Sequence, residues 1–101
     1  MNEIDRKVTT FLKDELELSP ATAAYNVLKK VIVAGIEDPE SLTSITKITG
    51  KNRKNSYRNV RYAISKIYDS PGYIKVVGNS EIITPKDFIV KCYEFVTENY
   101  I

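Results

Sequence analysis

The chain has 101 residues, of which 43% are hydrophobic and 28% charged, and its formal net charge is only +2. This length and composition suit one soluble globular domain, and they exclude a chain that is disordered throughout and a polycation. No apolar run approaches the roughly 18 residues that a membrane span needs, and the stretch MNEIDRKV does not resemble a secretory signal. Its one cysteine, Cys92, cannot form an internal disulfide, so we expect a cytoplasmic protein. From the length, we expect residues 1–101 to form a single domain.

The first half of the chain shows helical periodicity. Residues 2–16 place apolar side chains at helical spacing. Ser19-Pro20 predicts the N-cap and first position of a second helix, which ends near Ile36 and is apolar on most sides, as a central helix of a small bundle is. Residues 40–48 form a short predicted helix that Gly50 ends.

The second half begins with a long predicted helix over residues 53–69, followed by a predicted turn at Ser70-Pro71-Gly72. β-branched residues on both sides of Gly78 favour a short β-hairpin near residues 73–84. Thr84-Pro85 opens a last helix, whose apolar stripe includes Cys92 as a core thiol. The expected fold class is therefore all-α, a compact helical bundle with an embedded helix-turn-helix at about residues 40–69.

Charge is segregated along this near-neutral chain. Residues 41–68 contain no Asp or Glu, whereas the rest of the chain has eight basic and thirteen acidic residues. The basic residues of the acid-free window are Lys47, Lys51, Arg53, Lys54, Arg58, Arg61 and Lys66. An ordinary solvated helix carries both acidic and basic side chains, because Glu–Lys pairs four residues apart stabilise it. The segregation therefore indicates an anionic partner for this segment.

At roughly 100° per residue, the helix over residues 53–69 divides into two faces. The apolar face consists of Tyr57, Val60, Ala63, Ile64 and Ile67, and the polar face of Lys54, Asn55, Arg58, Asn59, Arg61, Tyr62, Ser65 and Lys66. The polar groups are those that hydrogen-bond phosphates and base edges.

A short helix, a glycine-containing turn and a longer basic helix are the parts of a helix-turn-helix, whose second helix enters the major groove of DNA. The side chains expected to contact bases are Arg58, Arg61, Lys54, Asn55 and Tyr62. Those expected to contact phosphates are Lys47, Lys51, Asn52, Arg53, Ser65 and Lys66.

Other functions are weighed against this one. A basic face is also compatible with solvation alone, and a protein-interaction module could use the same helix to bind an acidic partner or the transcription machinery. A non-specific nucleoid binder would be expected to carry a larger net charge. An enzyme is not expected, because the chain has no histidine and no evident acid–base or nucleophile cluster. No cofactor or metal is expected.

The order of several segments also resembles a known family. These segments are VTTFLKDELELSP (8–20), AYNVLKKVIVAGIEDPESLTSITK (24–47), RNVRYAISKIY (58–68) and TPKDFIVKCYEFV (84–96). Together they resemble the C-terminal DNA-binding effector domain of the master sporulation response regulator of spore-forming Firmicutes. This chain departs from the family in a shorter segment before SITK, in polar Thr49 and Ser56 at apolar positions, and in Tyr57 at an acidic position.

The resemblance implies an all-helical domain of a bacterial transcriptional regulator that binds duplex DNA at promoters, often as two copies on adjacent sites. It implies that Arg58 and Arg61 contact bases in the major groove. RNA polymerase is a further partner to expect. Nothing in the sequence supplies the phosphoacceptor pocket of a receiver domain, so we expect none within this chain.

Overall fold

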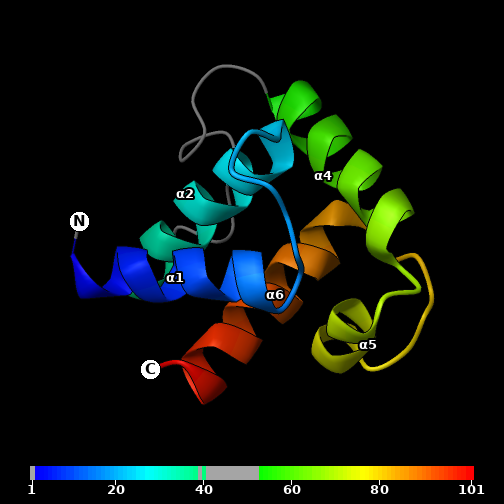
Figure 1. Ribbon diagram of the computed structural model, residues 1–101. Coiled ribbons are helices and arrows are strands. Elements are labelled where there is room, and N and C mark those ends of the chain that lie inside the picture. The colour runs from blue at the N-terminus through cyan, green and yellow to red at the C-terminus, as the bar shows by residue number, and fades with distance from the viewer. Residues whose placement is uncertain (1, 39, 41–52) are drawn as a thin grey trace.

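The computed structural model describes residues 2–38, 40 and 53–101. Its helices are α1 (Glu3–Asp14), α2 (Ala23–Glu37), α4 (Arg53–Ile67), α5 (Pro71–Val77) and α6 (Pro85–Asn99), and Figure 1 shows their arrangement. The described residues contain no strand, so the expected all-α class is confirmed. None of the described helices is long and apolar enough to cross a membrane.

Polar side chains fix where four of the helices begin. Asn2, Thr22, Ser70 and Thr84 each stand at an N-cap and accept a hydrogen bond from the backbone N–H three residues later. The oxygen–nitrogen distances lie between 2.8 and 3.3 Å. Each bond satisfies one of the N–H groups that a helix start leaves without a partner.

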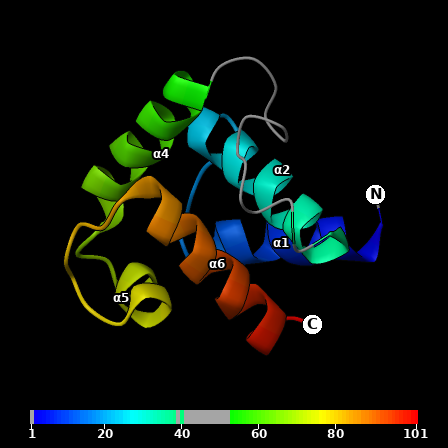
Figure 2. The ribbon, with the colours of Figure 1, turned by 180° about the vertical axis from the view of Figure 1, so that it is seen from behind.

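The core forms around α2, which packs against α1, α4 and α6, as the two opposite views in Figures 1 and 2 show. Leu28, Val31 and Ile32 on α2 are fully buried. The expectation that the second helix is central is therefore confirmed. Cys92 on α6 is also fully buried, and burial raises the pKa of its thiol, as expected for a core cysteine.

The predicted start of the second helix was wrong by three residues. α2 begins at Ala23 with Thr22 as its N-cap, not at Ser19-Pro20. Residues 19–22 instead form a turn, in which the Thr22 N–H and hydroxyl both donate to the Ser19 carbonyl at 3.0 and 2.8 Å. Thr22 caps the helix because its backbone is extended and its side-chain oxygen accepts a hydrogen bond from the Tyr25 N–H.

The predicted β-hairpin near residues 73–84 was also wrong, because α5 occupies the first half of this segment. Ser70 is its N-cap, and Gly78 ends it at φ +103° with a bond from its N–H to the Ile74 carbonyl of 2.7 Å. Tyr73 and Val76 are buried at helical spacing. The Tyr73 ring stacks on Phe88 of α6 at 5.5 Å between centroids, and its hydroxyl donates to the Glu81 carbonyl at 2.6 Å.

The expected short helix at residues 40–48 and the turn at Gly50 lie outside the described residues, apart from Glu40. The structure thus describes the second helix of the expected helix-turn-helix, and the motif as a whole stays a prediction.

Candidate nucleic-acid interface

The inner side of α4 fixes this helix to the rest of the protein. Val60 and Ile64 are fully buried and Ala63 is 7% exposed, while Tyr57 and Ile67 pack partly buried against the core. The helix packs on α2 and α6. All five predicted inward residues therefore lie on the packed side. Ser56 is buried as well, which the apolar pattern alone did not predict.

The outer side of α4 lies along one edge of the molecule, and no described helix covers it in either view (Figures 1 and 2). Asn55, Arg58, Arg61, Ser65 and Lys66 are exposed on this side. Tyr62 joins them with 62% of its surface exposed, which is unusual for a large aromatic residue. We call these six residues the outward face of α4. The structure thus brings together all of the candidate residues whose side chains it describes.

The cations of the outward face lack carboxylate partners. Within the described part of the chain, Arg58, Arg61 and Lys66 form no salt bridge. The ion pairs found there lie on other elements, and they are Lys7–Glu3, Lys29–Asp5 and Lys75–Glu15, at 3.3 to 3.5 Å. The three cations are therefore available to an anion from outside, at no cost of breaking an internal pair.

At the C-terminal end of the outward face, Lys66 and Ser65 both contact Tyr62. Lys66 Nζ lies 5.2 Å from the centroid of the Tyr62 ring, within the range of a cation–π contact. The Ser65 hydroxyl donates to the Tyr62 carbonyl at 2.6 Å. Since that bond uses its only proton, Ser65 can donate to a phosphate only if the hydroxyl rotates.

The structure adds Lys86, a residue that sequence reasoning missed. A surface cavity of about 300 Å³ is lined by Tyr57 and Arg61 from α4 and by Thr84, Pro85 and Lys86 at the start of α6. It has two cations and no carboxylate among its lining residues. The only signal in the sequence was a lysine in the first turn of a helix, where the helix dipole disfavours positive charge.

Comparison of the chain with protein-family models, curated proteins and solved structures finds no match.

Five candidate residues have no described side chain. Lys47, Lys51 and Asn52 lie outside the described residues, and Arg53 and Lys54 belong to α4 without described side chains. Within the described residues, no group of three or more His, Cys, Asp or Glu side chains is arranged to hold a metal ion.

Proposed function

We propose that the protein binds double-stranded DNA sequence-specifically through the outward face of α4 and regulates transcription. The observation that carries the proposal is a set of cations on that face without a carboxylate partner among the residues that the structure describes. Arg58, Arg61 and Lys66 project from a helix that contains no acidic residue and that no described helix covers. Such a surface is complementary to a polyanion.

The dimensions of α4 suit the major groove of DNA. Its 15 residues correspond to a rod about 22 Å long and about 10–12 Å across, and the major groove is about 12 Å wide. On a helix of this kind, Arg58 and Tyr62 lie near the centre of the outward face, with Asn55 about two turns before Tyr62. These side chains would face base edges, where Arg pairs with guanine and Asn with adenine.

The residues at the margins of the face suit phosphates. Lys66 lies at one margin beside the connection between α1 and α2, and Lys86 flanks Arg61 at the other. Their ammonium groups would contact the two strands that border the groove and fix the orientation of α4. Arg61, near the second margin, would reach a base from there.

The regulatory part of the proposal rests on the resemblance to the effector domain of the sporulation response regulator. That family binds promoters, and Arg58 and Arg61 correspond to its base-contacting arginines. A second copy of the chain on an adjacent site and contact with RNA polymerase are further parts of this proposal.

The test begins with selection of bound sites from a pool of random duplexes. Arg58→Ala should then cost about 1–3 kcal/mol on the selected site and relax selectivity, because it removes a base contact. Lys66→Ala should weaken selected and random duplexes alike and lower the slope of log K against log salt by about 0.9, because it removes one phosphate contact. Lys91→Ala is the matched control, since Lys91 is exposed on α6 on the side toward α5.

Two outcomes would contradict the proposal at different levels. Equal losses on selected and random duplexes for Arg58→Ala would exclude Arg58 as a base-contacting residue. If no duplex is retained at moderate salt, DNA binding itself is excluded, and an acidic protein partner for the same face becomes the better explanation.

A further inference from the structure

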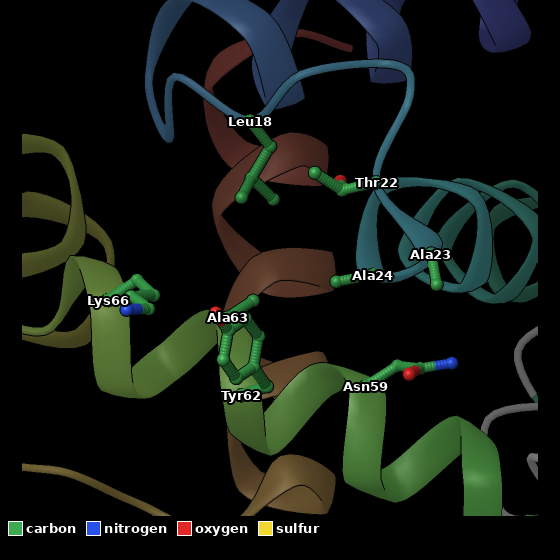
Figure 3. Close-up of a pocket in the computed structure, with 8 residues that line it drawn as sticks. All are labelled: Leu18, Thr22, Ala23, Ala24, Asn59, Tyr62, Ala63 and Lys66. Atoms are coloured by element: carbon green, nitrogen blue, oxygen red, sulfur yellow. The ribbon is translucent and has the colours of Figure 1, made fainter.

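A second cavity borders the outward face of α4, on the side opposite Lys86. It has a volume of about 340 Å³. Figure 3 shows side chains from three segments around one space, namely the connection between α1 and α2, the start of α2, and α4. The lining residues are Leu18, Thr22, Ala23, Ala24, Asn59, Tyr62, Ala63 and Lys66. We call this cavity the Leu18 pocket.

The walls of the Leu18 pocket are mainly apolar. Leu18, Ala24 and Ala63 are at least nine-tenths buried, and the Tyr62 ring adds an aromatic wall. Thr22 contributes no free hydroxyl, because its Oγ1 donates to the Ser19 carbonyl at 2.8 Å and accepts from the Tyr25 N–H at 3.3 Å. An apolar body could therefore displace water from beside Thr22 without leaving its hydroxyl unpaired.

The rim of the Leu18 pocket carries a positive charge. Among the described residues that line the pocket, Lys66 is the only charged one. Its ammonium lies over the Tyr62 ring and has no carboxylate partner in the described part of the chain. The Asn59 side chain, whose amide has no hydrogen-bond partner among the described residues, lies at the other end of the pocket, with Tyr62 between it and Lys66. An anionic group is thus the complement of this rim.

We propose that the Leu18 pocket binds a small amphipathic anion, with a flat apolar body of one or two rings and a carboxylate directed at Lys66. The volume lies at the lower end of the range for small-molecule sites, which favours a compact ligand. The apolar body would lie between Leu18 and Ala63 against the Tyr62 ring, with the carboxylate at the rim.

Such a ligand would oppose DNA binding, a consequence that rests on the proposed function. Tyr62 and Lys66 belong both to the Leu18 pocket and to the outward face of α4. A carboxylate held by Lys66 competes with a DNA phosphate for the same ammonium. By linkage, DNA would weaken binding of the ligand by the same factor.

The experiment uses 2-naphthoate, with neutral 2-naphthamide as a matched probe, in titrations of the full chain followed by backbone amide NMR without DNA. We expect saturable shifts around Leu18, Ala24 and Tyr62, with the acid bound about threefold more tightly than the amide, as for an ion pair at an exposed rim. Lys66→Gln should remove the preference for the acid, and Lys91→Gln should retain it.

A filling variant tests the apolar part separately. Ala23 is exposed at the first position of α2, so Ala23→Phe adds a ring at the pocket without disturbing the core. It should weaken both probes by at least about tenfold. Circular dichroism of each variant confirms that it is folded.

The outcomes separate this proposal from the proposed function. Absence of saturation in the millimolar range, or binding that Ala23→Phe leaves unchanged, overturns the pocket proposal and leaves DNA binding untouched. An unchanged acid preference in Lys66→Gln overturns the assignment of the carboxylate. If DNA binding fails but both probes behave as expected, the pocket stands and only its coupling to DNA falls.

Discussion

Gly72 provides the sharpest test of how α1 and α5 pack. A Cβ added to Gly72 would lie 1.6 Å from the backbone carbonyl oxygen of Glu15, and 2.7 Å from its carbonyl carbon. Real Cβ atoms essentially never approach another heavy atom within 3.0 Å, so these two atoms must separate by about 1.4 Å. Because the main chain fixes the position of this Cβ and the oxygen belongs to the main chain of Glu15, no side-chain rotation can relieve the contact, and α5 must shift away from the end of α1.

The expected cost of Gly72→Ala is at or beyond the upper end for overpacked positions, about 3 kcal/mol or more. A domain of this size has only about 5–15 kcal/mol of stability. The midpoint of thermal unfolding should therefore fall by roughly 12 °C or more. Helix propensity predicts the opposite sign, since Ala is favoured over Gly in a helix by about 1 kcal/mol.

Gly78→Ala, at the C-cap of the same helix, is the matched control. A Cβ at Gly78 meets nothing within 4 Å, but the residue has φ +103°, so the substitution costs only the backbone strain of about 1–2 kcal/mol. Urea and thermal unfolding followed by circular dichroism measure both variants. If Gly72→Ala is no less stable than Gly78→Ala, the close approach of α1 and α5 is wrong.

Three further predictions address other parts of the molecule. Lys86→Ala should weaken specific and random duplexes equally, about as Lys66→Ala does, in the same salt titrations, and an unchanged affinity would remove Lys86 from the interface. Thr9→Val should stabilise the protein by up to about 1 kcal/mol in urea unfolding, because the buried Thr9 hydroxyl has no hydrogen-bond partner in the described part of the chain; a loss of stability would show that the hydroxyl is satisfied. Burial raises the pKa of Tyr73, and a backbone hydrogen bond of Ile83 has a smaller opposing effect. The contribution of the neutral phenol to the free energy of unfolding is therefore complete below the unfolded-state pKa of about 10, and it is lost as pH rises through the folded-state pKa. Stability measured above pH 10 should therefore decline less steeply in Tyr73→Phe than in the parent protein.

Helical periodicity was sufficient to predict most of the fold because the apolar residues of each long helix repeat with one period. α5 was missed because its seven residues are too few to show a period, and because Ile74, Val76 and Val77 are β-branched. Its capping residues are compatible with either structure. Ser70-Pro71 suits a helix start as well as a turn, and Gly78 suits a helix end as well as a hairpin. Burial of Tyr73 against Phe88, which no local pattern contains, favours the helix.

The candidate site was predictable to the extent that it lies on one helix. A helical wheel places Arg58 and Tyr62 outward without any knowledge of the fold, and the structure agrees. Lys86 and the Leu18 pocket could not be predicted in this way, because each brings residues of α4 together with residues more than 20 positions away in sequence. Only packing of α4 on α2 and α6 brings these segments together.

The charges of α4 also differ from those of α1, and the difference bears on function. α1 has Glu3 and Asp5 in its first turn and Lys13 in its last, which is the arrangement that the helix dipole favours. α4 instead begins with Arg53 and Lys54 and contains no acid, so it gains no internal ion pairs and its first turn opposes the dipole. Its stability must come mainly from the burial of its inner face, since only Lys66 in its last turn suits the dipole. A bound polyanion would relieve this repulsion, so the DNA binding proposed above would make the protein more stable through the same charges that make α4 a poor isolated helix.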